Sequence, residues 1–401
     1  MFDLYKIRGI KKLAIFYIGG KLLKPFSNGK VKKAGMDLLK ESLNEEELEN
    51  VLQVLTYWRN AHILPLNHAE QLLLRYIFKI DKHAFLAKRL KRFESIRKKL
   101  RYIYKKNNNA MQLTGMQDIG GLRVVVSNYS KLKNIQKILM NEVCFYEDKK
   151  LIKFDDYINN PKDNGYRGIH LVAKFLNQYG DSRKIEIQLR TRLQHSWATS
   201  LEIIDLFTGQ NLKSDDGEKG FLVFFKRVSN QFSLIERNEN FSKSNMELIT
   251  REYLEAVLKS EALYMECIEI KNFLEKSNQF SKSIEQNFND YRVLLNKVEK
   301  DVVKQKNGYV LLRLNTIKGS VDTEFFRKED YLKATKLYGE YEKLLLTNKS
   351  WVIALVSTNA FGGVKEAYPN YFADSQLFLQ YLGLIKIAAN LAEAKLRTLA
   401  V

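Results

Sequence analysis

The sequence predicts an α+β protein in which a β-sheet is flanked by helices, and three regional patterns support this fold class. Apolar residues recur at helical spacing over about residues 36–80 and again over about 218–300. Between about 118 and 206, short apolar strands alternate with turn residues. The residues after about 300 combine both patterns. These changes predict an N-terminal helical region, a central α+β domain, a second helical region and a small C-terminal α/β domain, at 1–84, 85–210, 211–300 and 301–401.

A strongly basic segment, Lys82–Lys106, follows the N-terminal helices. It carries eleven Lys or Arg residues and one acid, Glu94. Its apolar residues recur every three to four positions, which predicts a helix with the basic residues on the opposite face. That face is explained either by contact with solvent or by contact with a polyanion. The apolar stripe consists of Leu90, Phe93, Ile96, Leu100 and Ile103.

The clearest strands of the central domain are Leu122–Val126, Ile169–Phe175 and Lys184–Arg190, because β-branched and apolar residues are frequent in each. The C-terminal domain is predicted to contain two strands, a helix over about 329–346 and a final helix that Asp374 or Ser375 caps. The two strands are Tyr309–Leu314 and Trp351–Ser357.

Composition excludes several classes of protein. The chain has two cysteines, Cys144 and Cys267, which are too few for a disulfide scaffold or a cysteine-rich zinc module. Its five histidines show no metal-binding spacing. No apolar stretch reaches the roughly 18–20 residues of a membrane span, and we interpret Leu13–Gly20 as a buried helix or strand. We therefore expect a cytoplasmic protein that binds no membrane.

The net charge of +20 favours polyanionic partners such as nucleotides or RNA. Charge alone does not distinguish between these partners, and it leaves homo-oligomerisation open.

Two predicted strands each carry polar residues along one face. Alternation places Glu186, Gln188 and Arg190 on one side of their strand, opposite Ile185 and its apolar neighbours. The neighbouring strand is predicted to place His170 and Lys174 on its own polar face. Such a face is either open to water or forms the wall of a polar cleft.

The loop Asp156–Tyr166 precedes the His170 strand and is rich in Pro, Asn and Gly, which favour turns. It presents Lys162 and Tyr166 close together. An aromatic side chain beside a cation suits stacking on a nucleobase with charge near its phosphates. Ordinary solvated turn residues are the alternative explanation.

Two carboxylates from separate strands suggest a magnesium site. Asp118 lies directly before the strand that contains Arg123, and Glu186 lies within another strand. Mg²⁺ prefers oxygen ligands and often takes one or two protein carboxylates together with nucleotide phosphates. The pair Gly120 and Gly121 is expected to let a phosphate or the metal approach the backbone.

Five motifs, in this order and spacing, resemble the synthetase domain of RelA/SpoT-type alarmone enzymes over about residues 85–210. They are Arg89–Ile96, Asp118–Arg123, Pro161–His170, Glu186–Thr191 and His195–Thr199. The resemblance implies a nucleotidyltransferase-like mixed β-sheet flanked by helices. It also implies transfer of pyrophosphate from ATP to the 3′-OH of GDP or GTP. The flanks, including Trp58–His62 and Ala367–Phe372, are similar to those of longer stand-alone members.

For the ATP side, the resemblance implies that Arg89 and Arg123 sandwich the adenine ring. Lys91, Ser95 and Lys99 then hold the phosphates of ATP.

For the acceptor side, it implies that Tyr166 stacks on the acceptor base, with four further polar residues around it. These are Lys162, His170, Gln188 and His195.

The catalytic roles implied by the resemblance belong to Asp118 and Glu186. Both would ligate Mg²⁺, and Glu186 would also take the proton from the 3′-OH.

Two departures from the family pattern bear on function. Lys153–Asp156 is acidic where bifunctional relatives are basic, which resembles synthesis-only enzymes. The N-terminal segment has His62, His68 and His83 but no adjacent His-Asp pair, so we expect no alarmone hydrolysis.

Three functions remain open at this stage. The first is synthesis of (p)ppGpp, and the second is a toxin-like transfer of pyrophosphate to the 3′ end of tRNA. The basic segment Lys82–Lys106 encourages the second. The third is an inactive nucleotide-binding module that recruits a partner.

Overall fold

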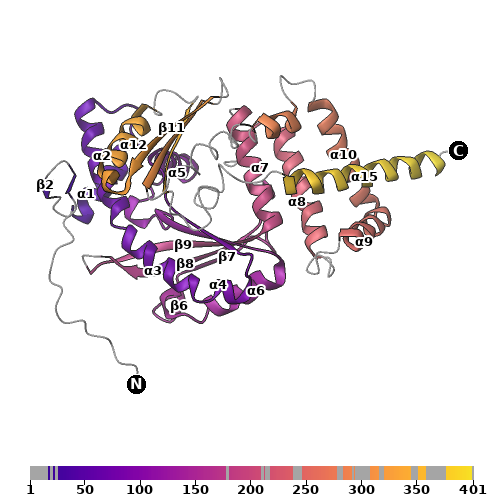
Figure 1. The fold of residues 1–401 in the computed structure, drawn as a ribbon, viewed down its shortest axis with the longest axis horizontal. Helices are drawn as coiled ribbons and strands as arrows, with labels where there is room; N and C mark the ends of the chain where they lie inside the picture. The colour runs from indigo at the N-terminus through magenta and orange to yellow at the C-terminus, as the bar shows by residue number, and fades with distance from the viewer. Residues whose placement is uncertain are drawn as a thin grey trace.

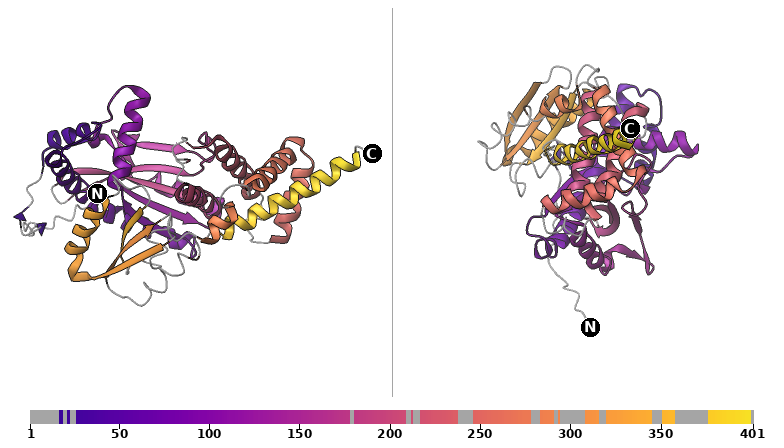
Figure 2. Two further views of the ribbon diagram at one scale, coloured as in Figure 1. Left: turned by 90° about the horizontal axis from the view of Figure 1, so that it is seen from above. Right: turned by 90° about the vertical axis from the view of Figure 1, so that its right-hand side faces the viewer.

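The computed structural model describes residues 17–18, 21–22, 26–177, 180–208, 212, 217–237, 246–277, 283–290, 293, 308–315, 320–344, 351–357 and 376–399. Figure 1 shows a central sheet with its covering helices, a smaller sheet beside it, and a helical cluster that extends to one end of the molecule. The C-terminal helix points away from the central sheet, as the view from above also shows (Figure 2).

The central sheet has five strands in the order β3-β4-β9-β8-β7. Strands β4 and β9 are parallel, whereas the other neighbours are antiparallel. The predicted α+β fold with a mixed sheet is therefore confirmed, and the three predicted central strands correspond to β4, β8 and β9. The bounds are β3 Phe85–Leu90, β4 Gly120–Val126, β7 Lys153–Asp156, β8 Ile169–Leu176 and β9 Ser182–Thr191.

One face of this sheet is apolar because alternate residues of each strand point to the same side. Leu122 and Val124 of β4 and Ile185 and Ile187 of β9 are fully buried there. The helices α3 and α6 cover this face, and their apolar residues belong to the same core cluster. They lie below the sheet in Figure 1. The bounds on this side are α3 Ile63–Leu74, α4 Ile77–Ile80 and α6 Tyr129–Leu139.

A second core joins three helices that lie near the start of β4. It unites α1 (Asn28–Asp37), α2 (Glu45–Asn60) and α5 (Phe93–Asn107), and Ile119 also packs in it. Asn44 caps α2, because its side chain and that of Glu47 form a reciprocal capping box. This packing holds α5 close to the residues that precede β4.

The basic segment is not one helix, and the prediction was wrong at its N-terminal part. Residues 85–90 form β3, and only residues 93–107 are helical. Leu90 therefore packs at the end of a strand, whereas Phe93, Ile96 and Leu100 form the buried stripe of α5. The change occurs because β3 pairs with β4 along its full length.

The helical cluster contains five long helices and a short helical segment at residues 284–290, around the largest core of the described residues. Its centre is a group of phenylalanines that includes Phe224, Phe225 and Phe378. The helices are α7 Arg192–Thr208, α8 Lys219–Arg237, α9 Met246–Leu258, α10 Glu261–Ser277 and α15 Gln376–Leu399.

The helix α15 corrects two expectations. It packs against α10 in the helical cluster, where Lys271 Nζ lies 2.7 Å from Glu393 Oε2, and not in the C-terminal α/β unit. Residues 376–398 are also long and apolar enough to cross a membrane by length and composition alone. Tyr381, Ile385 and Ala388 are buried in the cluster, which accounts for much of that apolarity.

The small sheet has the strand order β11-β10-β12, and both pairings are antiparallel. The predicted strands β10 (Gly308–Asn315) and β12 (Trp351–Ser357) and the helix α12 (Tyr331–Leu344) are confirmed. Strand β11 (Ser320–Arg327) was missed, because its polar edge position gives little apolar signal. The predicted cap at Asp374 or Ser375 and the segment 367–372 lie outside the described residues.

Short elements complete the fold. The strand at Tyr17–Ile18 confirms extended structure for that part of Leu13–Gly20, whose remaining residues lie outside the described ones. These elements are β1 Tyr17–Ile18, β2 Lys21–Leu22, β5 Tyr146–Glu147, β6 Lys150–Leu151, and the 3₁₀ turns η1 Leu113–Gly115, η2 Val143–Phe145 and η5 Lys328–Asp330.

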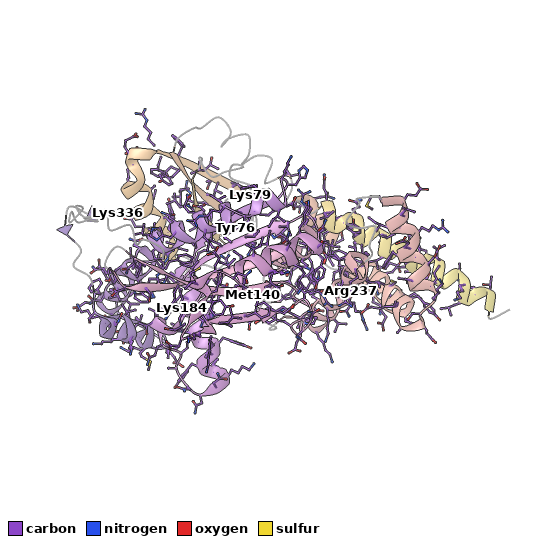
Figure 3. The ribbon with its side chains drawn as sticks, turned by 90° about the horizontal axis from the view of Figure 1, so that it is seen from below. Tyr76, Lys79, Met140, Lys184, Arg237 and Lys336 are labelled. Carbon is purple, nitrogen blue, oxygen red and sulfur yellow. The ribbon has the colours of Figure 1, made fainter. Side chains whose placement is uncertain are left out.

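The predicted unit boundaries at 84 and 210 do not separate independent cores. Helix α3, before the first boundary, packs on the central sheet, and α7, before the second, packs in the helical cluster. Amphipathic helices pack wherever an apolar face is available, irrespective of chain order. Figure 3 shows the central sheet and the helical cluster with their side chains; Lys184 of β9 and Arg237 at the end of α8 are labelled.

Candidate active site

The polar face of the central sheet collects residues from four strands. The pairing places Arg89 of β3 opposite Gly121 of β4, and Gly121 beside Glu186 of β9. Gln188 of β9 lies between Arg123 of β4 and His170 of β8. Paired residues on neighbouring strands point to the same side. Five of the predicted site residues therefore share one face. Four of them are buried or half-buried, and only Arg89 is exposed, so this face is not simply open to water.

Asp118 lies just before β4 and is held by two lysines. Lys91 Nζ donates to its Oδ2 at 2.8 Å, and Lys99 Nζ lies 2.9 Å from its Oδ1. Burial alone would raise the pKa of this carboxyl, but the two ammonium groups hold it below its ordinary value. Burial also lowers the pKa of Lys91. Asp118 is thus an ionised acid in an electropositive corner.

The helix α5 provides part of this corner. Lys91 lies just before the helix, and its backbone N–H donates to Ile119 O at 2.7 Å. Ser95 and Lys99 lie four residues apart on α5, so both occupy the face that meets Asp118. The three residues predicted to hold the phosphates of ATP are therefore brought together.

Glu186 occupies the centre of the polar face. His170 Nδ1 lies 3.2 Å from Glu186 Oε1, and Gln188 Nε2 donates to Oε2 at 2.7 Å. Burial opposes ionisation, yet His170 and then Gln188 hold the pKa of Glu186 well below its usual range. The negative charge of Glu186 in turn raises the pKa of Asp118. The two ionised carboxylates, Asp118 and Glu186, therefore repel each other electrostatically across the start of β4.

Tyr166 is oriented by its hydroxyl group. The phenolic oxygen lies 2.6 Å from His170 Nε2 and accepts from Arg190 Nε at 3.2 Å and Nη2 at 3.1 Å. Burial raises the pKa of a phenol, but Arg190 and His170 outweigh it and lower the pKa of Tyr166 to about 7. Burial lowers the pKa of His170, but Tyr166 and Glu186 outweigh this effect, and the pKa is raised above its ordinary value.

Lys162 lies over two aromatic rings of this loop. Its ammonium is 4.6 Å from the ring centre of Tyr157 and 5.1 Å from that of Tyr166. The two rings meet edge to face at 5.8 Å. This arrangement confirms that Lys162 and Tyr166 lie side by side, as predicted from the loop sequence.

The two predicted adenine-binding arginines share one face of the β3–β4 pair. Arg89 is exposed and Arg123 is buried, and Gly121 opposite Arg89 leaves space beside them. Burial, then the charges of Arg190 and Arg89, lower the pKa of Arg123 to about 9. Concentrated positive charge at this point favours binding of an anion.

His195, on α7, lies on the same side of the sheet. Its ring meets Phe85 of β3 edge to face at 5.3 Å. Burial, then Arg123 and Arg190, lower the pKa of His195 well below its ordinary value. The imidazole is therefore neutral and lies near the arginines of the polar face.

Gly120 and Gly121, the first two residues of β4, do not share the single role that was expected for both. A Cβ on Gly120 would come within 2.7 Å of Ile185 Cδ1, so this glycine serves packing on the apolar face. A Cβ on Gly121 would meet only Glu186 O, at 3.7 Å. Only Gly121 faces the polar side, so the expectation of close backbone approach applies there.

The donor set at Asp118 and Glu186 fits a hard divalent cation. Both carboxylates are ionised, and the oxygens of Asp118 face the ammonium groups of Lys91 and Lys99, which would shift toward the nucleotide phosphates when a cation binds. Among the described residues, no group of three or more His, Cys, Asp or Glu side chains is placed to hold a metal ion, so substrate oxygens would have to complete the shell. A coordination shell made of one or two protein carboxylates and the phosphate oxygens of a nucleotide is typical of Mg²⁺.

Two residues of the site were missed by the sequence analysis. Arg190 contacts Tyr166, with its guanidinium 4.9 Å from the ring centre, and Tyr157 packs edge to face on His170 at 5.2 Å. Strand alternation already placed Arg190 with Glu186 and could have identified it. No local signal pointed to Tyr157.

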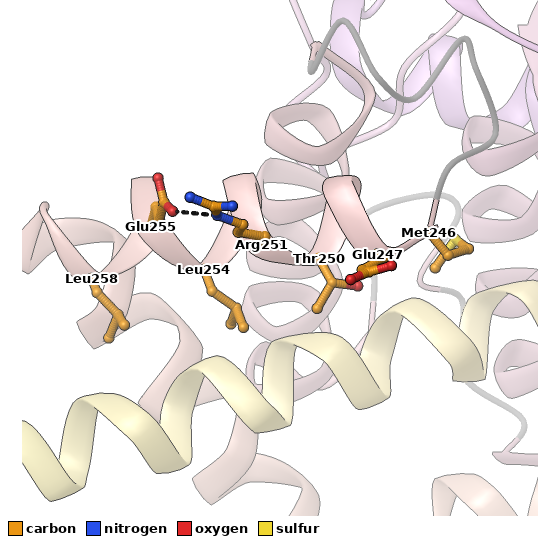
Figure 4. A pocket seen from close by; sticks show the side chains of 7 residues that line it. All are labelled: Met246, Glu247, Thr250, Arg251, Leu254, Glu255 and Leu258. Carbon is orange, nitrogen blue, oxygen red and sulfur yellow. Dashed lines mark hydrogen bonds and ion pairs between the residues drawn. The ribbon is translucent and has the colours of Figure 1, made fainter.

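A separate groove lies in the helical cluster, on α9 beside α15. Leu254 and Leu258 point toward α15, whereas Arg251 and Glu255 point away from it and form an ion pair (Figure 4). Its residues carry no catalytic constellation. The groove, of about 670 Å³, is lined by Met246, Glu247, Thr250, Arg251, Leu254, Glu255 and Leu258.

Residues 88–203 match a family model described as a region found in RelA/SpoT proteins. Two similar relatives are GTP pyrophosphokinases of Bacillus subtilis. YwaC is 34% identical over 114 residues, which are 28% of this chain and 52% of the relative. YjbM is 31% identical over 118 residues, which are 29% of this chain and 53% of the relative. The matches thus span about half the length of these relatives.

Solved structures similar to this chain include small alarmone synthetase 1 of Bacillus subtilis bound to its product pppGpp. It is 22% identical with a TM-score of 0.38, over 48% of this chain and 99% of that structure. A GTP pyrophosphokinase family protein of Streptococcus pneumoniae is 23% identical with a TM-score of 0.35, over 49% and 95% respectively. The matched region contains all twelve predicted site residues.

Proposed function

We propose that this chain is a pyrophosphokinase, because residues 88–203 match the model of a region found in RelA/SpoT proteins. It transfers the β,γ-pyrophosphate of ATP to the 3′-OH of GDP or GTP and so makes (p)ppGpp. The observation that supports this most is the position of Glu186. Its ionised carboxylate lies between a strongly basic corner, formed by Lys91 and Lys99, and the aromatic loop that carries Tyr166.

The basic corner is suited to the donor nucleotide. Adenine binds between the guanidinium groups of Arg89 and Arg123, beside the space that Gly121 leaves. The phosphates then meet Lys91 and Lys99, which Asp118 holds in place. Bound Mg²⁺, ligated by Asp118 and Glu186, would neutralise phosphate charge.

The aromatic loop is suited to the acceptor. Tyr166 offers a ring for stacking on guanine, and its orientation is defined by His170 and Arg190. Lys162 lies next to that ring and provides a cation for the acceptor phosphates. Holding both nucleotides in line contributes most of the rate acceleration in such transfers.

The chemical step needs no covalent intermediate with the protein. The 3′ oxygen attacks the β-phosphorus of ATP, the bond from that phosphorus to the oxygen bridging the α-phosphate breaks, and AMP leaves. Glu186 takes the proton of the hydroxyl, and the ammonium groups of Lys91 and Lys99 balance the charge on the transferred group.

One assay tests this proposal. The full chain is incubated with Mg²⁺, γ-labelled ATP, and either GDP, GTP or deacylated tRNA, and products are separated by chromatography and by gel. Label in a guanosine nucleotide is the expected result. Absence of transfer to GDP and GTP would contradict it. Absence of transfer to all three acceptors, with ATP still bound, would support the inactive module. Incubation of the product with the chain and no ATP tests the accompanying proposal that the chain does not hydrolyse it.

A second candidate acceptor, the 3′ end of tRNA, is favoured by one observation. Tyr102 and Tyr104 are 50% and 43% exposed on α5, among Lys98, Lys105 and Lys106, which are also exposed. Such a surface continues outward from Lys99 and suits a polynucleotide. Label in tRNA, and not in nucleotide, would select this acceptor.

A further inference from the structure

The loop that carries Tyr166 is bound along its outer side to helix α8 of the helical cluster. Ser229 Oγ of α8 donates to Gly165 O at 2.5 Å. Gly165 has a φ of +91°, and a Cβ at this position would lie 2.9 Å from Lys226 Cα. The loop backbone therefore approaches α8 so closely that only glycine fits.

Arg167 forms the second connection, directly after Tyr166. Its Nη1 donates to Ile158 O at 2.9 Å within the loop, while Nε and Nη2 reach Ser229 Oγ at 3.2 Å and Asn230 Oδ1 at 3.3 Å. One guanidinium thus joins the start of the loop, its end and helix α8. The fixed fork of arginine suits such a three-way contact better than the single ammonium of lysine.

The connection continues into the helical cluster. Asn230 Nδ2 donates to Glu266 Oε1 of α10 at 2.9 Å, and Gln231 Nε2 donates to Oε2 at 2.6 Å. Tyr253 of α9 donates to Gln231 Oε1 at 2.8 Å. The hydrogen bonds run without interruption from the loop through α8 to α10 and α9.

We propose that Arg167 is a positioning residue for the acceptor site and that α8, held by the helical cluster, sets the orientation of Tyr166. The guanidinium of Arg167 donates to Ser229 of α8 and to the backbone of Ile158 in the loop. Its effect on the reaction therefore passes through the loop. The acceptor role of this loop rests on the proposed function, whereas the contact with α8 is independent of it.

The test compares Arg167→Ala, Arg167→Lys and Asn230→Ala with the unmodified chain. Steady-state kinetics give KM for GDP and for ATP separately, and calorimetry measures binding of GDP and of α,β-methylene-ATP. Arg251→Ala is the matched control, since this exposed arginine of α9 pairs with Glu255 away from the loop. Thermal melting shows whether each variant is folded.

We expect Arg167→Ala to raise KM for GDP and the dissociation constant of GDP by about tenfold or more. KM for ATP and the dissociation constant of α,β-methylene-ATP should change by less than about twofold. In Arg167→Lys, KM for GDP should lie between the values for the unmodified chain and for Arg167→Ala. Asn230→Ala should raise KM for GDP by a smaller factor. Asn230→Ala also serves if Arg167→Ala does not fold.

Equal effects on GDP and ATP, or no effect of either variant, would overturn the positioning role. If the unmodified chain binds GDP without transferring pyrophosphate to it, the proposed function fails. The binding comparison then still decides whether α8 orients the loop.

Discussion

The phenolic oxygen of Tyr166 lies 2.6 Å from Nε2 of His170. Through its other ring nitrogen, His170 lies 3.2 Å from Glu186 Oε1. One histidine therefore connects the aromatic ring proposed to bind the acceptor with the acid proposed to accept its proton. We therefore expect that occupation of the proposed acceptor site would affect the charge state of Glu186 through this imidazole.

Glu186→Gln tests the acid directly. The amide keeps the shape of the side chain but loses the charge that ligates a cation and accepts a proton, so we expect the rate to fall about 10³-fold. Binding of α,β-methylene-ATP, measured by calorimetry, should persist. Glu255→Gln on α9 is the control. Near-normal turnover in Glu186→Gln would refute the assignment.

Tyr166→Ala and Tyr166→Phe separate the ring from its hydroxyl. Loss of the ring should raise KM for the guanosine acceptor roughly 10–100-fold, which corresponds to about 1.4–2.7 kcal/mol and lies within the range for stacking of one base. The phenylalanine variant keeps the ring and loses only the contacts with His170 and Arg190, so its KM should rise less than about tenfold. Tyr146→Ala, at a tyrosine 36% exposed on β5, is the control. Identical effects of both substitutions would argue against stacking.

Asp118→Asn should alter the dependence of the rate on Mg²⁺. Removal of one carboxylate charge weakens binding of a hard cation. The concentration of Mg²⁺ that gives half the maximal rate should therefore rise about tenfold or more. Removal of divalent ions from the unmodified chain with a chelator should abolish transfer, and added Mg²⁺ should restore it. The control is Asp322→Asn on β11, and an unchanged Mg²⁺ dependence in Asp118→Asn would exclude Asp118 as a ligand.

The raised pKa of Glu236 predicts that this residue makes a pH-dependent contribution to the free energy of unfolding. Its carboxylate receives hydrogen bonds from Thr191 and Gln194, but burial is the largest effect and raises its pKa from 4.5 to about 7. Between these values the folded state binds more protons than the unfolded state, so the free energy of unfolding falls as the pH rises through this range.

In Glu236→Gln this loss should be absent, because a neutral amide can replace the protonated acid. The variant should be more stable than the unmodified chain by about 3 kcal/mol near pH 8 and no more stable near pH 4. Denaturant unfolding at both pH values measures the difference. A stability difference that is the same at both would show that Glu236 does not titrate between them.

Much of the site could be read from local pattern. Alternation in Lys184–Arg190 and the pairing of neighbouring strands are enough to place Glu186, Gln188 and His170 on one face, since side chains alternate with a period of two. The turn residues of 156–166 likewise predict the loop that presents Tyr166. The strands of the central sheet were predicted because they are short, apolar and bounded by turns, whereas the mixed topology of the sheet was expected from the family resemblance alone.

Contacts between distant segments could not be read in this way. Lys91 and Lys99 meet Asp118 only because α5 packs with α1 and α2 in a separate core. Residues 376–399 look like part of the C-terminal unit, yet they complete the helical cluster. The attachment of Gly165 and Arg167 to α8 joins residues more than sixty positions apart. Periodicity encodes which face of an element is apolar, whereas the partner that covers that face depends on the shape of the whole core.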